Sequence, residues 1–166
     1  FQQGLHLNLT EGKPLSFAAS LIHHGQFHKL PQFIHKAWKG DLNSEEIFLE
    51  CEAQLLRFKE YSGQLPDFID GHQHIHCLPL LHPIIEKLHK KYLSNKEKFW
   101  IRLPLQPFYK LPFCYCLKAN MKSQIIAALG GRKLEKWLKK QNINFNTSFG
   151  GIYDFNDSLR HYPKLL

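Results

Sequence analysis

Hydrophobic positions in the first part of the chain follow two different periods. In residues 4–9, three leucines alternate with polar residues, which predicts a strand. Asn43 followed by Glu46 fits a capping box at the start of a helix, and apolar residues at helical spacing extend that pattern to Gly63. Residues 16–43 show neither period and contain three Gly/Pro breaks, so we predict a long loop there.

Strand and helix patterns continue to alternate toward the end of the chain. In order, they predict a strand from Phe68 through His76, a helix that begins between Pro79 and Pro83, a strand at 99–103, one or two helices within 115–141, a strand at 144–149 and a helix from Asp157. Strands that alternate with helices indicate βα units and a parallel sheet. The predicted fold class is therefore α/β.

The composition supports a single folded domain. The chain has 166 residues, of which 43% are hydrophobic and 13% aromatic, enough material for a sizeable core. Disordered chains are poor in such residues, so disorder is excluded. No stretch approaches the roughly 18 consecutive apolar residues of a membrane span, and we expect no membrane partner.

The net charge of +8 and the isoelectric point near 9.3 raise the question of nucleic-acid binding. Some of the basic residues share two stretches with apolar residues at helical spacing: Lys87, Lys90 and Lys91 in one, and Arg132, Lys133, Lys136, Lys139 and Lys140 in the other. A solvated helix face explains both, and no aromatic–basic motif or zinc finger is present. We therefore expect no nucleic-acid partner and keep a basic nucleic-acid-binding domain as the weaker alternative.

Four cysteines are too few and too irregularly placed for a disulfide framework. Cys114 and Cys116 form a C-x-C pair that could bind a metal, but no second Cys/His pair stands at a finger-like distance. Apolar packing is the favoured alternative for this pair. Reduced thiols indicate a cytoplasmic location.

Candidate chemistry concentrates in residues 70–76, which read Asp-Gly-His-Gln-His-Ile-His. If this segment is extended, His72, His74 and His76 point to one face, with neighbouring side chains about 6.6–6.8 Å apart at their bases. Metal–imidazole bonds are only about 2.0–2.1 Å long, so two neighbours could share an ion but His72 and His76 could hardly do so. At least one histidine then orients substrate or transfers a proton, while Asp70 supports a ligand or a charged imidazole. The alternative is a polar strand end whose histidines satisfy one another.

His6 is the second candidate, on the polar side of its predicted strand beside Asn8. Taken alone, a histidine of this kind is more often a hydrogen-bonded core or surface residue. Ligands of α/β sheets collect at the carboxyl ends of parallel strands, and both histidine sites are predicted near strand ends. His6 is therefore a candidate functional residue only in combination with the histidines of residues 70–76.

Two long motifs carry a family resemblance, Gly4–Leu15 (GLHLNLTEGKPL) and Asp70–Pro79 (DGHQHIHCLP). Shorter matches accompany them at Glu50 and Gln54, at Arg102–Pro104 and at Phe149–Ile152. Together these segments, which cover most of the chain, resemble the YdjC-like family of ChbG/HpnK-type carbohydrate deacetylases.

The resemblance implies an incomplete or distorted (β/α) barrel and metal-dependent hydrolysis of N-acetyl groups on amino sugars such as acetylated chito-oligosaccharides. Matched residue by residue, it assigns the metal to His6 and His72. The family's Asp-Asp-Phe-Gly-like motif, expected to supply a further ligand and a base, is absent, as is a His-Pro-Gly-like segment. A complete barrel takes about 250 residues, so we expect residues 1–166 to be one YdjC-like domain truncated at both ends.

The family resemblance points to Mg²⁺, whereas two imidazole ligands favour Zn²⁺ or another transition metal, and both stay open. We expect substrate or supporting roles for Asp70, His74 and His76, and a substrate contact for Arg102. Three aromatic residues could stack on a sugar, with a place in the core as the favoured alternative: Trp38, Trp100 and Tyr109. The competing function is an inactive metal- or sugar-binding remnant of the family. The oligomeric state is open, with a homodimer as the candidate assembly.

Overall fold

The computed structural model describes residues 1–105 and 130–146, and its centre is a four-stranded parallel sheet. The strands follow the order β1 (Gly4–Leu7), β4 (Phe68–Gly71), β5 (Trp100–Ile101) and β6 (Asn144–Phe145), and each pairs in parallel with the next. Strand order equals chain order, as in successive βα units of a barrel. The predicted α/β class with parallel strands is confirmed, and the four strands form an open sheet.

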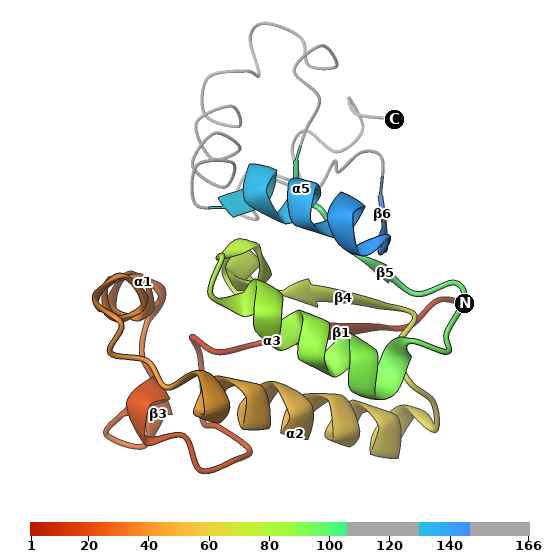
Figure 1. The fold of residues 1–166 in the computed structure, drawn as a ribbon. Helices are drawn as coiled ribbons and strands as arrows, with labels where there is room; N and C mark the ends of the chain where they lie inside the picture. The colour runs from red at the N-terminus through yellow and green to blue at the C-terminus, as the bar shows by residue number, and fades with distance from the viewer. Residues whose placement is uncertain (106–129, 147–166) are drawn as a thin grey trace, which may run out of the picture.

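Helices connect the strands and bury one apolar stripe each. The connections contain α2 (Ser44–Ser62), α3 (Leu81–Leu88) with its continuation η3 (His89–Leu93), and α5 (Arg132–Gln141). In Figure 1, α2 runs along β1, α3 lies in front of β1 and β4, and α5 lies beside β6. The apolar positions predicted to face inward on α2 and α3 are buried or half-buried.

The start of α2 agrees with the predicted cap but not with the predicted capping box. The Asn43 side chain accepts hydrogen bonds from the backbone amides of Glu45 and Glu46, and Gly63 ends the helix in the left-handed conformation. Glu46 does not reach back to Asn43 and instead accepts a hydrogen bond from the Ser20 amide at 2.7 Å. The cap therefore also ties the preceding segment to α2.

The prediction of a long loop at 16–43 is wrong. This segment contains η1 (Ala19–Leu21), the hairpin strands β2 (Ile22–His23) and β3 (Gln26–Phe27), and the helix α1 (Leu30–Lys39). Its three Gly/Pro breaks are the boundaries of these elements. His24 and Gly25 both have positive φ and form the two-residue hairpin turn, Pro31 lies in the first turn of α1, and Gly40 ends α1 in the left-handed conformation.

The extended conformation predicted for residues 72–76 is also wrong. Strand β4 ends at Gly71, and His72–Cys77 form the 3₁₀ turn η2, in which Gln73 and His74 have φ of 51° and 59°. A Cβ atom on Gly71 would lie 2.7 Å from His76 Nδ1, so only glycine allows η2 to fold back this closely on the strand end. The three histidines consequently leave the turn in different directions.

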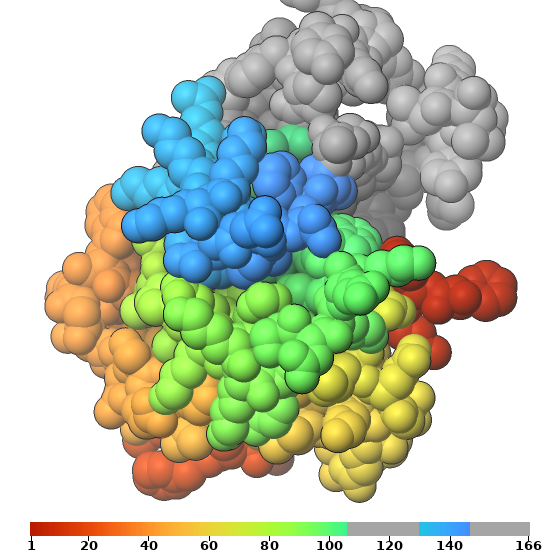
Figure 2. Space-filling view, turned by 45° about the vertical axis from the view of Figure 1, so that its right-hand side comes forward, coloured from red at the N-terminus to blue at the C-terminus, as the bar shows by residue number. Residues whose placement is uncertain are grey.

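Most of the apolar core lies between the sheet and its helices, and Figure 2 shows α5 and β6 packed against the green segment that carries α3. The first residues project from this body, and Phe1 is fully exposed. No helix within the two described stretches is long and apolar enough to cross a membrane. Several predicted features lie outside the described residues: the helical part of 115–129, residues 147–149 of the fourth strand, the Phe149–Ile152 motif, the helix from Asp157, the Cys114/Cys116 pair and Tyr109.

Candidate metal centre

The register of the parallel sheet brings His6 and Asp70 together. The two residues are direct partners in the β1–β4 pairing, each one residue before its strand ends. His6 Nδ1 donates to Asp70 Oδ1 at 2.7 Å. A carboxylate only accepts hydrogen bonds, so the His6 proton sits on Nδ1 and the lone pair of Nε2 points away from Asp70.

Arg102 holds the second oxygen of the same carboxylate. Its guanidinium lies 2.6 Å from Asp70 Oδ2 and 4.9 Å from the centre of the Phe68 ring. Asp70 is thus bound on both oxygens, and its side chain is only 11% exposed. An acceptor fixed in this way keeps the His6 ring in one orientation, as carboxylate partners of metal-bound histidines do.

The His72 ring meets the His6 ring at the beginning of η2. His6 Nε2 and His72 Nδ1 are 3.4 Å apart, and the two rings are almost perpendicular, at 81°. The far nitrogen of His72, Nε2, lies 2.9 Å from Glu11 Oε2, but the direction of this contact is not that of a hydrogen bond. His72 Nε2 is therefore a buried nitrogen beside a carboxylate, and Nδ1 is left to face His6.

This pair fits two adjacent positions around one divalent ion. Nitrogens bound at about 2.0–2.1 Å to the same ion lie roughly 2.8–3.4 Å apart, with the short end for right-angle and the long end for tetrahedral geometry. The observed separation of 3.4 Å matches this range, and the Asp70 contact already fixes the required tautomer of His6. Within residues 1–105 and 130–146, no group of three potential ligands is placed to hold an ion, so the candidate site in these residues is limited to the histidine pair.

His76 and His74 have different surroundings from the pair. His76 is completely buried and donates from Nε2 to the Arg102 carbonyl at 2.7 Å, which leaves Nδ1 without a hydrogen-bond partner. Burial lowers the pKa of His76 to about 4, so the ring is neutral. His74 is half-buried and its pKa is also lowered, first by burial, while the charge of Asp70 acts in the opposite direction. The position of His76 fits a supporting role and excludes direct contact with a ligand in solvent.

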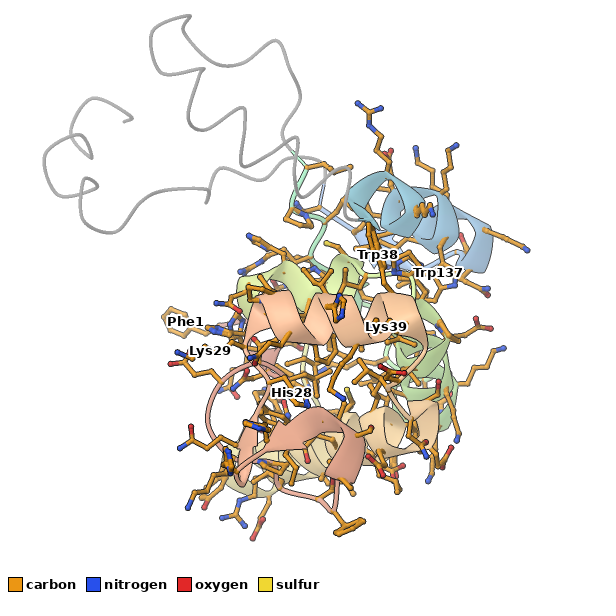
Figure 3. All side chains as sticks on the ribbon, turned by 90° about the vertical axis from the view of Figure 1, so that its left-hand side faces the viewer. Phe1, His28, Lys29, Trp38, Lys39 and Trp137 are labelled. Atoms are coloured by element: carbon orange, nitrogen blue, oxygen red, sulfur yellow. The ribbon has the colours of Figure 1, made fainter. Side chains whose placement is uncertain are left out.

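The aromatic candidates occupy different environments. Trp38 is 88% exposed on α1, which makes the expectation of a core residue wrong, and Figure 3 shows it projecting toward the side of the molecule that carries α5. Trp100 is half-buried and stacks on Phe68 with ring centres 4.5 Å apart. In the described part of the chain, neither tryptophan ring stacks on His6 or His72.

The loop after β1 contributes residues that spacing alone did not single out. Thr10 donates to Gln73 Oε1 at 3.0 Å, and this contact joins the loop to the left-handed part of η2. The loop is fixed by Glu50 and Gln54 of α2. Gln54 pairs with both backbone groups of Asn8, and the fully buried Glu50 carboxylate accepts from residues 15 and 16 and from Gln54. The sequence signal that indicated these two residues was a glutamate and a glutamine four residues apart on a helix face that is otherwise apolar.

Comparison with known sequences places this chain in a family. The model of the YdjC-like protein family matches residues 1–164, which is nearly the whole chain. The chain belongs to the YdjC-like family. Its two motifs that carry the paired histidines lie within this match.

Several curated proteins that are similar to this YdjC-like chain are named as deacetylases. A carbohydrate deacetylase of Danio rerio is 34% identical over 123 residues, which cover 72% of this chain and 37% of that protein. A chitooligosaccharide deacetylase of Serratia marcescens is 39% identical over 50% of this chain and 32% of its own length, and a carbohydrate deacetylase of Mus musculus is 42% identical over 46% and 26%. The matched part of the chain thus spans about a third of the length of these relatives.

A solved structure shows the same fold. It is described as a putative cellobiose-phosphate cleavage protein from Enterococcus faecalis V583, with a TM-score of 0.62 and 22% sequence identity. The match covers 98% of this chain and 52% of that one. At this identity the likeness establishes the architecture, in agreement with the parallel α/β sheet.

Proposed function

We propose that this chain carries the metal-binding half of a carbohydrate deacetylase that hydrolyses N-acetyl groups on amino sugars. The observation that carries the proposal is the convergence of His6 Nε2 and His72 Nδ1 at 3.4 Å, with His6 oriented by Asp70. Both histidines lie in the motifs of a family whose curated members include carbohydrate and chitooligosaccharide deacetylases.

In this proposal each residue of the cluster has a separate task. His6 and His72 hold a divalent ion, which when bound activates water and polarises the acetyl carbonyl. Asp70 keeps the proton of His6 on Nδ1, and Arg102 holds Asp70 in place. His74, neutral and half-buried beside the pair, is the candidate for a substrate contact or a proton transfer.

The identity of the metal is part of the proposal. Two neutral imidazoles suit Zn²⁺ or another transition metal, whereas the family resemblance implies Mg²⁺, which prefers oxygen ligands. A carboxylate from outside the described residues would add a ligand to the two histidines. Its oxygen would favour a harder ion such as Mg²⁺ over Zn²⁺. Loading the metal-free protein with Mg²⁺ and Zn²⁺ in parallel separates the two.

The function is tested by acetate release from acetylated chito-oligosaccharides in the metal-loaded full-length protein. We expect His72→Ala to abolish acetate release, because the ion loses one of its two described ligands. His89→Ala, a half-buried histidine at the end of α3 that packs against Phe99, is the matched control and should retain activity. Normal turnover by His72→Ala would overturn the assignment.

A metal- or sugar-binding remnant is the second candidate, favoured by the finding that the candidate site in the described residues is limited to the histidine pair. The same protein separates the two functions. Tight metal binding with no acetate release from any acetylated chito-oligosaccharide would establish the remnant.

A further inference from the structure

The β2–β3 hairpin and α1 enclose a hollow that the histidine pair does not use. It has a volume of about 380 Å³ and is lined by His23, His28, Pro31, Gln32, His35 and Lys36. A smaller cavity, bordered by Leu30 and Ile34, separates another face of α1 from His74 and the rest of η2. The hollow therefore lies on a different flank of α1 from the candidate metal centre.

The segment that forms this hollow has no carboxylate of its own, and the Glu46 carboxylate of α2 reaches it at the Ser20 amide. Residues 12–40 contain no Asp or Glu, although they include four lysines and four histidines. No lysine of this segment forms an ion pair with a carboxylate of the described residues. Lysines elsewhere on the surface are paired, for example Lys87 with Glu45 and Lys139 with Glu135. The hollow thus contains the fixed charge of Lys36, which no carboxylate of the described residues pairs with.

His28 is the buried member of the lining. It is 7% exposed and lies below α1 in the view of Figure 3, and its ring stacks near that of His23 with centres 6.2 Å apart. Its pKa is lowered by burial and by the charges of Lys36 from α1 and His23 from β2, against a hydrogen bond with the Ser20 backbone. Bound negative charge would cancel the repulsion from Lys36 and stabilise the protonated imidazole.

Clustered histidines could also indicate a metal site, but the described residues place no three of them, nor any mixed set, around one point. We propose that the hollow between the β2–β3 hairpin and α1 binds a phosphate-type oxyanion. Lys36 supplies the fixed charge, and the imidazoles of His23, His28 and His35 supply donors when protonated. The site does not depend on the deacetylase proposal, because it shares no residue with the His6–His72 pair.

Binding is tested by isothermal titration and by NMR of the histidine rings, in metal-free buffer at pH 6, with inorganic phosphate as the probe. We expect saturable 1:1 binding, shifts in the His23 and His28 ring signals, and a higher His28 pKa in the presence of phosphate. Lys36→Gln and His35→Gln, changes at a half-buried and an exposed position of the lining, should each weaken binding about tenfold, the effect of losing one charge-assisted contact. Lys139→Gln on α5 removes the same charge elsewhere and should leave the affinity unchanged.

A comparison of inorganic phosphate with glucose 6-phosphate distinguishes the source of the oxyanion. Equal binding of inorganic phosphate and glucose 6-phosphate supports a site for the free anion, and tighter binding of the ester supports a site for a phosphorylated ligand. Equal weakening in Lys36→Gln and Lys139→Gln would show general charge attraction and overturn the proposal. The absence of saturable binding with either phosphate compound would also overturn it.

Discussion

Asp70 is the residue on which the geometry of the candidate metal centre depends. Its two carboxylate oxygens hold His6 from β1 and Arg102 from the segment after β5, so one side chain connects three neighbouring strands. Neither neighbour of His6 in the sequence could fix the ring in this way. The tautomer of His6 is therefore set by a residue 64 positions away.

Replacement of Asp70 by Asn keeps the shape of the side chain and removes its charge. We expect Asp70→Asn to weaken divalent-metal binding by about 10- to 100-fold, the usual effect of losing the carboxylate partner of a histidine ligand. Isothermal titration of the metal-free protein measures this change. Asp67→Asn, just before the same strand and paired with Lys96, is the matched control and should leave metal affinity intact. Equal affinities of wild type and Asp70→Asn would contradict the role of Asp70.

At the scale of elements, α2 fixes the loop that follows β1. Glu50 is fully buried, and its carboxylate accepts hydrogen bonds from the Leu15 amide, the Ser16 amide and hydroxyl, and Gln54. Glu50→Gln places an amide group among these donors, so at least one of them loses its acceptor. We expect a loss of about 2–4 kcal/mol in the free energy of unfolding, measured with urea.

Glu45→Gln provides the comparison on the same helix. The Glu45 side chain is 63% exposed and pairs only with Lys87, so its replacement should cost less than about 1 kcal/mol. A Glu50→Gln protein as stable as Glu45→Gln would show that the buried carboxylate does not hold the loop.

Elements with regular local patterns could be predicted from the sequence, and those fixed by distant contacts could not. The cap, apolar face and terminal glycine of α2 are all local signals, and the helix begins and ends where they indicate. The turn η2 was missed because Gln73 and His74 adopt left-handed conformations that Thr10 and the close approach to Gly71 support. The helix α1 was missed because Pro31 indicates a break in the chain. Proline is also common in the first turn of a helix, and Pro31 lies there in α1.

The same distinction applies to the site. The motifs containing His6 and His72 indicated which residues to consider, whereas their separation depends on the β1–β4 register and the η2 turn. Strand alternation wrongly placed the His76 side chain on the same face as that of His72. Its burial follows from the turn, which directs its ring toward the Arg102 carbonyl.

At the scale of the whole molecule, the positive charge is distributed over separate helices. Lys87 and Lys91 pair with Glu45 and Glu52 of α2, and Lys139 pairs with Glu135 of α5. These contacts show that the two basic stretches include residues engaged in ion pairs on helix surfaces.

The buried His76 makes stability depend on pH. Its folded-state pKa of about 4 lies below the ordinary value of 6.5, so the unfolded chain binds the proton more tightly. The stabilisation is complete above pH 6.5 and is lost as the pH falls toward 4, by about 2 kcal/mol at pH 5. Urea unfolding measures the free energy of unfolding of both proteins. The difference between wild type and His76→Gln should be smaller at pH 5 than at pH 7.5 by this amount. Parallel stability curves would show that His76 is not buried as a neutral ring.

The most direct test of the candidate metal centre is the affinity of the metal-free protein for Mg²⁺ and Zn²⁺, measured by isothermal titration. We expect one site in the wild type, and a loss of more than about 100-fold in His6→Gln and in His72→Gln, because each removes a direct ligand rather than a supporting partner. His89→Gln should bind as the wild type does. Unchanged affinity in either His6→Gln or His72→Gln would contradict the assignment of one shared ion to this pair.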